Sequence, residues 1–430
     1  MKLIFRNVTV VNASGKDLRD VFVDEGKIVG PFEDISARVI DGSGKFLMPG
    51  AIDGHVHFRE PGASQKEDWE TGSAAAAMGG VTTVLDMPNN EPPMVTLEAL
   101  EEKRKLIEGR SHVNYGLYFG ATLNNFEALE KVKGVVGFKL YMGSSTGDLL
   151  VDDASAWEKI FEIAGKKGLP VVVHAEDESR IKKRAAEFAG HDEAKTHAEI
   201  RDCECAVLAA RAALELRKKI GNKLHLAHMT CKEEVVLMRE FADPNLSCEV
   251  APHHLYFTED DMEDSFLKMN PPLRHEEDLR VLWEAVRDGT VTCLATDHAP
   301  HTKEEKSQTH WKAPAGVPGV EFLLPLMLNE VNANMLPFER VAELLCTGPA
   351  RIFGLKGKGE IREGMDADLV LVDMNLEKTI AESDVMSKCG WTPYLGYKLK
   401  GWPVMTVVNG EVVMEEGEIV RKAGGRDVNM

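Results

Sequence analysis

The segment AIDGHVH at residues 51–57 begins as an apolar strand and ends in two histidines separated by one residue. Seven further apolar segments of strand length follow it. They are VTTVLDM (81–87), HVNYGLYFG (112–120), VVGFKLYM (135–142), LPVVVHAE (169–176), KLHLAHM (223–229), LSCEVAP (246–252) and VTCLATD (291–297). Stretches with apolar residues at helical spacing, such as CECAVLAARAALELRKKIG, lie between them. This alternation over residues 50–354 predicts a parallel (β/α)8 barrel of the TIM type.

An open, doubly wound sheet is the alternative for the same alternation of strands and helices. It is weakened because no GxGxxG turn follows any of the predicted strands.

Both ends of the chain contain short strands and turns in place of the strand–helix alternation. The first 49 residues include LIFRNVTVVN, and the tail includes DADLVLVD and VMTVVNGEVVMEEGEIV. Asn409-Gly410 in that tail is typical of a tight hairpin turn. We therefore predict one small β-sandwich domain that residues 1–49 and 355–430 build together.

The composition excludes several classes of partner. Lys and Arg total 51 against 70 Asp and Glu, a net charge of −19 that would repel nucleic acids and anionic lipids. No apolar run approaches the roughly 18–20 residues needed to span a bilayer. The N-terminus lacks a signal-peptide pattern, and the seven cysteines form no CxxC pair. These features predict a cytoplasmic protein with reduced thiols that acts on a small molecule.

Ionisable side chains stand at or near the ends of five predicted strands: His55 and His57, Lys139, His174, His228, and Asp297. The carboxyl ends of the strands form the active-site face of such a barrel. His55 and His57 point to the same face because they are two residues apart on a strand, so both could bind one ion. Each residue alone has an ordinary structural explanation. Together they predict a metal site, since buried histidine and aspartate are costly without partners.

Four histidines and an aspartate are more ligands than one tetrahedral zinc ion needs. Two ions about 3.5–4 Å apart that share a hydroxide would use all of them. A bridging anion is missing from this set, and Lys139 has the wrong charge as an ammonium. Carbamylation by CO2 would make Lys139 a bridging anion; the alternative is a salt-bridged or solvent-facing lysine.

An ordered series of motifs along almost the whole chain resembles the signature set of dihydroorotases in the amidohydrolase superfamily. The motifs are DGHVHFREPG (53–62), DMPNN (86–90), GFKLYMGSSTG (137–147), VVVHAED (171–177), HLAHMT (225–230), APHHL (251–255), MNPPLR (269–274) and ATDHAPH (295–301). The resemblance is more specific for the superfamily than for the substrate. It implies reversible interconversion of L-dihydroorotate and N-carbamoyl-L-aspartate in pyrimidine biosynthesis, with zinc as the cofactor and a homodimer as the assembly.

The resemblance also implies roles for the metal-type residues. His55, His57 and Asp297 would hold the more buried zinc ion. His174 and His228 would hold the second ion, and carbamylated Lys139 and a hydroxide would bridge the two. Some dihydroorotases instead place an aspartate from an SDDG-like segment at the site. This chain has Asp148, Asp152 and Asp153 in GDLLVDD but lacks that motif, and its FKLYMG setting favours Lys139.

Asp297 would take a proton from the bridging water and return it to the leaving nitrogen. For the substrate, the resemblance implies contacts from His57, Arg59, Asn89, Asn270, His301, and the backbone near Ala315 and Gly316. A guanidinium at Arg59 can hold a carboxylate through two hydrogen bonds. The polar segment 301–316 is predicted to be a lid over the substrate.

Two alternatives to this assignment remain open for single residues. Arg59 could be a salt-bridged surface residue, and Asn89 could be a turn residue before Glu91-Pro92.

Two rival functions also remain. An allantoinase, hydantoinase or dihydropyrimidinase would share the metal frame but would not need a carboxylate clamp. A non-catalytic scaffold homologue would typically lose metal ligands, whereas all six expected positions are filled here.

Overall fold

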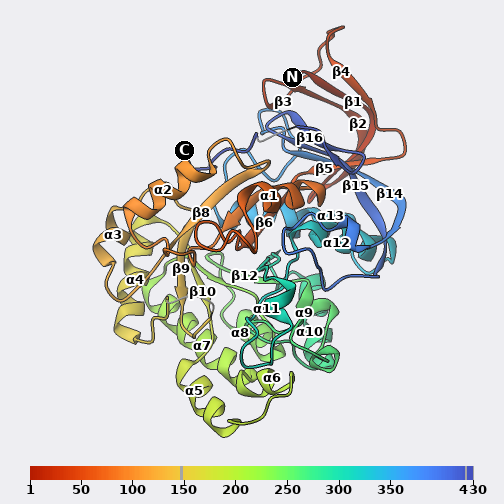
Figure 1. Ribbon diagram of the computed structural model, residues 1–430. Helices are drawn as coiled ribbons and strands as arrows, with labels where there is room; N and C mark the ends of the chain where they lie inside the picture. The colour runs from red at the N-terminus through yellow and green to blue at the C-terminus, as the bar shows by residue number, and fades with distance from the viewer. Residues whose placement is uncertain (146–148, 422–423, 430) are drawn as a thin grey trace.

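The computed structural model describes residues 1–145, 149–421 and 424–429. It contains a large barrel and, beside it, a sheet in which the red N-terminal strands and the blue C-terminal strands lie together (Figure 1). The predicted fold class, a barrel with a small β domain from both chain ends, is confirmed.

Eight parallel strands form the barrel, in the order in which they occur along the chain. They are β6 (Ala51–Val56), β7 (Val81–Asp86), β8 (Asn114–Gly120), β9 (Gly137–Tyr141), β10 (Val171–His174), β11 (Leu224–Leu226), β12 (Leu246–Val250) and β13 (Cys293–Leu294). Each predicted segment contains one of them. A parallel bridge between Val56 and His298 joins the first strand to the segment after the last, so the barrel closes next to the histidine pair.

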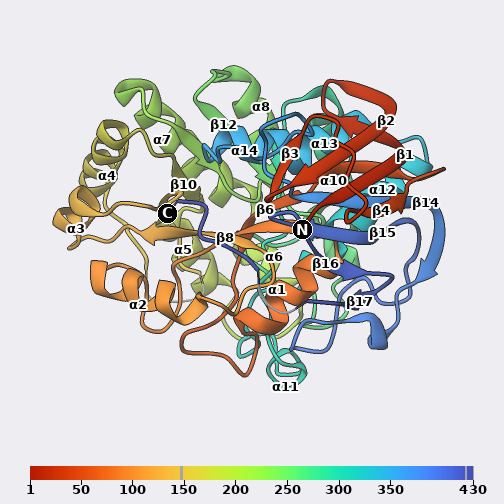
Figure 2. The same ribbon diagram turned by 90° about the horizontal axis from the view of Figure 1, so that it is seen from above.

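Helices alternate with the strands along the chain and surround the barrel on its outside (Figure 2). Helix α4 shows why they begin and end where they do: Asp153 accepts a hydrogen bond from the Ala156 N–H at its start, and Gly168 ends it at φ +68°. The α-helices are α1 (Trp69–Met78), α2 (Leu97–Ile107), α3 (Phe126–Lys131), α4 (Ala154–Lys167), α5 (Glu178–Glu187), α6 (Thr196–Ile200), α7 (Cys203–Ile220), α8 (Lys232–Glu240), α9 (His253–Tyr256), α10 (Glu276–Asp288), α11 (Lys303–Lys306), α12 (Leu323–Asn332), α13 (Phe338–Ala342) and α14 (Gly348–Ile352). Short turns of other helix types are η1 (Glu259–Asp261), η2 (Val320–Phe322), η3 (Glu343–Thr347) and η4 (Glu382–Asp384).

The small domain is one hydrogen-bonded sheet of nine strands, so its strands are connected edge to edge rather than divided into two separate sheets. The strands are β1 (Leu3–Asn12), β2 (Gly15–Asp24), β3 (Lys27–Val29), β4 (Arg38–Asp41), β5 (Phe46–Pro49), β14 (Leu369–Thr379), β15 (Lys398–Val408), β16 (Glu411–Glu415) and β17 (Glu418–Ile419). The two chain ends meet where β5 pairs with β14. The predicted Asn409-Gly410 hairpin connects β15 to β16, with φ of +51° and +77° at its two residues.

The C-terminal part of the chain also contacts the barrel. The Trp391 indole N–H donates to the carbonyl of His301, on the active-site side. At the amino end of β8, the N–H of Tyr115 donates to the carbonyl of Arg426. These contacts make the two parts one packed structure, while the boundaries at 49/50 and 354/355 stay a prediction. Among the described residues, every helix is too short or too polar to cross a membrane.

Candidate active site

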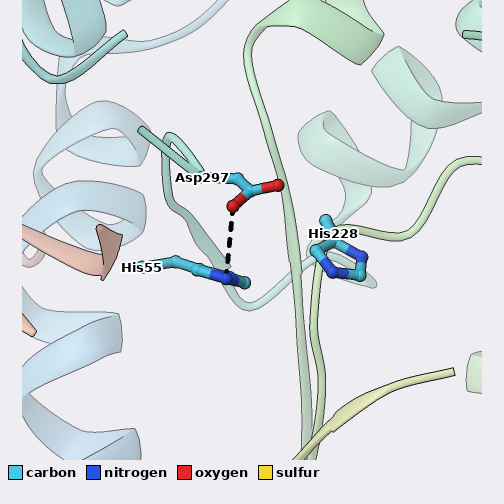
Figure 3. Close-up of side chains that lie close together, drawn as sticks. All are labelled: His55, His228 and Asp297. Carbon is cyan, nitrogen blue, oxygen red and sulfur yellow. Dashed lines mark ion pairs between the residues drawn. The ribbon is translucent and has the colours of Figure 1, made fainter. Parts of the chain in front are cut away.

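Three side chains from distant parts of the chain meet at the barrel mouth: His55 on β6, His228 just after β11, and Asp297 just after β13 (Figure 3). One ligand atom from each lies within 4.8 Å of the others, and all three residues are buried. The Nε2 atom of His55 is 3.3 Å from Oδ1 of Asp297. Two imidazoles and a carboxylate facing one point are ligands that suit a zinc ion.

The other two predicted histidines, His57 and His174, each contact one member of this group. We call the five residues His55, His57, His174, His228 and Asp297 the metal-type cluster. His57 Nε2 lies 2.9 Å from the same Asp297 Oδ1. His174 Nδ1 lies 3.0 Å from Nε2 of His228. Burial lowers the pKa of His57 to about 4 and also lowers the pKa of His174, so the rings are neutral near pH 7 and can bind metal.

Lys139 lies on β9 with its side chain fully buried, and its Nζ atom has no hydrogen-bond partner among the described residues. Burial lowers its pKa to about 8, although Glu249 and Asp297 act in the opposite direction. The alternative of a solvent-facing or salt-bridged lysine is therefore wrong. A buried amine without a partner next to an acid–histidine cluster fits a side chain that is completed by another group.

The candidate aspartates after Lys139 do not share this environment. Asp152 is exposed, and Asp153 is exposed and caps helix α4. Asp148 lies outside the described residues. Of the described candidates for the bridging ligand, which are Lys139, Asp152 and Asp153, only Lys139 is buried. It lies near the carboxylates of Glu249 and Asp297.

The backbone is strained at the site. His228, Asp297 and Arg59 have positive φ values of 34°, 47° and 51°, which non-glycine residues rarely adopt. Such strain persists only where the surrounding structure enforces it, and it clusters at functional sites.

Two glutamates that the sequence analysis did not single out hold the histidines. Glu249 on β12 contacts His55 Nδ1, and Glu176 contacts His174 Nε2 at 2.8 Å. Because each glutamate accepts the ring N–H, the other nitrogen of each ring is left to bind metal. The alternation VVVHAE placed Glu176 on the same face as His174, so this partner could have been found from the sequence. Glu249 had no comparable signal.

The predicted substrate-binding residues Arg59 and His301 are both buried, with 6% and 0% of their surface exposed. Arg59 Nε donates to the carbonyl of Pro300, and its Nη2 lies 3.2 Å from Nε2 of His301. The alternative of a surface arginine is thus wrong. Asn89 is half-buried, and its Oδ1 lies 2.7 Å from His57 Nδ1, so it contacts one of the predicted metal-binding histidines.

The remaining predicted contacts surround the same mouth. Asn270 Oδ1 lies 2.8 Å from His197 Nε2, and the Ala315 carbonyl lies 3.0 Å from His301 Nε2. Gly316 has a φ of +139°, and a Cβ there would meet the carbonyl oxygen of Ala299 at 2.5 Å, so only glycine fits.

The predicted lid, segment 301–316, is held by two buried lysines. Lys306 donates to the carbonyls of Lys268, Pro314 and Gly316 at 2.9–3.0 Å. Lys268 donates to the carbonyls of His310 and Ala313. Both ammonium groups therefore fix the loop backbone that borders the site, while movement of the loop stays a prediction.

Tyr141, at the end of β9, is a further residue that the sequence analysis missed. Its hydroxyl is buried and makes no hydrogen bond to any described residue. Its ring lies 5.9 Å from that of His174, and its hydroxyl interacts electrostatically with Asp297 and Arg59. Burial raises the pKa of this hydroxyl, so it keeps its proton and remains a donor between the metal-type cluster and Arg59.

Comparison with known proteins agrees with this geometry. Residues 46–413 match the model of the Amidohydrolase family. A dihydroorotase of Methanosarcina mazei is 38% identical over 94% of this chain and 92% of its own length. A dihydroorotase of Pyrococcus abyssi is 40% identical over 90% of this chain and 87% of its own.

The solved structure of an L-hydantoinase (dihydropyrimidinase) from Arthrobacter aurescens superimposes with a TM-score of 0.94 and 33% identity, over 98% of this chain and 97% of that one. The similar proteins thus carry two kinds of name, and all of them are cyclic-amide hydrolases. The chain belongs to the amidohydrolase family, and it is a cyclic-amide hydrolase.

Proposed function

We propose that the protein is a zinc-dependent dihydroorotase, which interconverts L-dihydroorotate and N-carbamoyl-L-aspartate in pyrimidine biosynthesis. The observation that carries this proposal is the buried pair Arg59 and His301 beside the metal-type cluster. Arg59 is buried, and its hydrogen bonds among the described residues go to the Pro300 carbonyl and to His301 rather than to a carboxylate. A buried guanidinium of this kind is costly unless a ligand supplies the anion. The ring carboxylate of dihydroorotate is such an anion.

The donor set fits two zinc ions. Four imidazoles and a carboxylate are nitrogen and oxygen ligands of the kind zinc prefers, and the buried Lys139 Nζ can supply a bridging anion once carbamylated. We propose that His55, His57 and Asp297 hold one ion, His174 and His228 hold the other, and carbamylated Lys139 bridges them. When bound, the ions supply a Lewis acid for the amide carbonyl and a nucleophile at neutral pH.

The chain's own residues then move the protons and orient the ring. Burial by itself would raise the pKa of Asp297, but His55, His57 and His228 hold it well below its usual value, so the carboxylate is ionised and can accept a proton. It returns that proton to the leaving nitrogen, or takes it in the reverse direction. We propose that the buried Tyr141 hydroxyl, which has no hydrogen-bond partner among the described residues, donates to the ring's carbonyl oxygen, where negative charge develops.

A second candidate is a hydantoinase or dihydropyrimidinase, which the similarity to the Arthrobacter protein favours. Their rings lack the carboxylate, so they would leave Arg59 and His301 without an anionic partner. The buried pair Arg59 and His301, which we call the carboxylate clamp, therefore favours dihydroorotate over rings without a carboxylate. A non-catalytic scaffold is not favoured, because His55, His228 and Asp297 lie close enough together to hold a metal ion.

The test is turnover of L-dihydroorotate, N-carbamoyl-L-aspartate, hydantoin, dihydrouracil and allantoin by one preparation supplied with zinc and bicarbonate. We expect selective turnover of the carboxylated pair and about two zinc ions per chain by elemental analysis. Activity confined to the uncarboxylated rings would replace dihydroorotase with the second candidate. Absence of any turnover by metal-loaded protein would refute the catalytic proposal.

Homodimer formation and a cytoplasmic location also belong to this proposal. Light scattering of the purified chain tests the first, and cell fractionation tests the second.

A further inference from the structure

The side chain of Lys66 lies in the loop after β6 and reaches His301 from the side opposite Arg59. Its Nζ atom is 3.1 Å from His301 Nδ1 and 2.9 Å from Oε1 of Glu305. Only 16% of the side chain is exposed. No motif in the sequence pointed to this lysine.

The contact determines which nitrogen of His301 carries the proton. An ammonium group has donors only, so Nδ1 must be the unprotonated acceptor. The proton of the neutral ring is then on Nε2, where it can be donated to the carbonyl of Ala315 at 3.0 Å. The ring is neutral, since burial together with Arg59, Lys66 and Lys306 lowers the pKa of His301 well below its usual value.

This assignment leaves two donors converging on one small region. Arg59 Nη2 lies 3.2 Å from the same Nε2 atom, and both atoms then carry hydrogens. Two N–H groups at this distance cannot bond to each other, whereas an anionic oxygen beside them could accept from both. In this tautomer the Nε2 hydrogen has the Ala315 carbonyl as its acceptor, whereas Nη2 of Arg59 cannot donate to Nε2 and is left to donate to a carboxylate.

The other tautomer of His301 would remove the need for a carboxylate as acceptor. With its proton on Nδ1, the ring would present an unprotonated Nε2 to Arg59, and the guanidinium would donate to it directly. Glu305 Oε2 lies 3.7 Å from Nδ1, beyond hydrogen-bond distance, and would have to move closer to accept from it. The two residues would then satisfy each other, and the site would lose most of its preference for an anion.

We propose that Lys66 is a specificity-determining positioning residue: it holds His301 in the Nε2–H tautomer, so that Nε2 cannot accept from Arg59 and the guanidinium donates to the carboxylate of the substrate. The proposal rests on the proposed function, because it needs a carboxylated ring. Lys66 contacts His301 and Glu305 and none of the metal-type residues. The proposal therefore predicts that replacing Lys66 changes the preference for carboxylated rings and leaves the rate of the hydrolytic step unchanged.

The first test uses kinetics of the zinc-loaded full chain. We expect Lys66→Met to raise KM for L-dihydroorotate about tenfold or more, as for loss of a hydrogen bond to a charged group, with kcat nearly unchanged. KM for a slowly turned-over neutral ring, such as dihydrouracil, should not rise. Lys66→Arg, which also has donors only, should restore most of the affinity, and Lys66→Glu, which can only accept, should be the most impaired.

Lys303→Met is the matched control. Lys303 lies on helix α11 beside Glu305 but is solvent-exposed and pairs with Glu382. This variant should match the wild type for both rings. Equal losses on carboxylated and neutral rings in Lys66→Met would indicate a structural role and overturn the proposal.

The second test reads the tautomer itself. Proton–nitrogen correlation spectra of protein labelled at histidine show which ring nitrogen is protonated. We expect Nε2–H for His301 in the wild type and Nδ1–H in Lys66→Met, with His301→Gln identifying the signal. An unchanged tautomer in a folded, zinc-replete Lys66→Met variant would overturn the proposal. Should the wild type fail to act on dihydroorotate, the proposed function fails by itself, and the spectra still decide whether Lys66 sets the tautomer.

Discussion

Glu249 binds two histidines at once: its Oε1 atom lies 2.5 Å from Nδ1 of His55, and its Oε2 atom lies 2.9 Å from Nε2 of His225. Burial by itself would raise the pKa of Glu249, but the two histidines hold it well below its usual value. The carboxylate is thus ionised inside the barrel, and it directs Nε2 of His55 toward Asp297.

Replacing this carboxylate should weaken metal binding. Glu249→Gln keeps the volume but removes the charge and one acceptor, so His55 is no longer fixed in one tautomer. We expect the affinity for zinc to fall about 10–100-fold, as for other partners of metal-binding histidines. Competition with a coloured chelator measures this directly. Glu321→Gln, a buried glutamate that accepts from the Met386 N–H, is the control, and equal zinc affinity in both variants would contradict the prediction.

Carbamylation of Lys139 should depend on pH in a defined direction. The pKa is lowered to about 8, so the ammonium dominates below that pH and the nucleophilic amine dominates above it. At a fixed concentration of dissolved CO2, the rate of labelling of metal-free protein should rise about tenfold per pH unit below 8 and level off above it. Carbon-13 spectra with labelled CO2 provide the measurement.

The control for this experiment is Lys268, another buried lysine of similar pKa. Burial lowers the pKa of Lys268 to about 8, but its Nζ is occupied by two backbone carbonyls. Lys268→Met should keep the carbamate signal and Lys139→Met should lose it. The reverse result would remove Lys139 from the metal site.

Arg59→Met should separate substrate recognition from chemistry. The buried guanidinium is the proposed partner of the ring carboxylate, and loss of such a pair costs about 2–5 kcal/mol. We expect kcat/KM for L-dihydroorotate to fall at least about 30-fold while zinc content is unchanged. Steady-state kinetics and elemental analysis measure the two effects. Arg362→Met, at an exposed site, is the control and should have wild-type kinetics. Near-normal kinetics in Arg59→Met would refute the proposal that Arg59 binds the ring carboxylate.

The loop that borders the site should loosen when Lys306 is replaced. Its ammonium donates to three backbone carbonyls, and a methionine would leave all three without that donor. We expect Lys306→Met to raise KM for every ring substrate and to speed proteolytic cleavage within residues 307–315. Lys312→Met, in the same loop but exposed, should be cut at the wild-type rate. Equal protection of the two variants would show that Lys306 does not hold the loop.

The sequence by itself determined the barrel, because strand length, apolar content and the helical spacing between strands are local properties. It also placed the metal-type residues, since the carboxyl ends of parallel strands share one face and His55, His174 and Asp297 each stand at or just beyond a predicted strand. Alternation within VVVHAE could also have placed Glu176 on the same face as His174, although the sequence analysis did not single out this glutamate.

Only the tertiary structure decided what these residues touch. Lys66 and His301 are separated by 235 positions in the chain, and Glu249 is 194 positions from His55. Their contacts depend on how loops and strands close around the barrel mouth, which no local pattern records. The burial that lowers the pKa of Lys139 is likewise a property of the packed barrel. The sequence therefore predicted which ionisable residues meet at the barrel mouth, and the fold set their protonation and their partners, because desolvation and hydrogen bonding arise only once distant segments pack together.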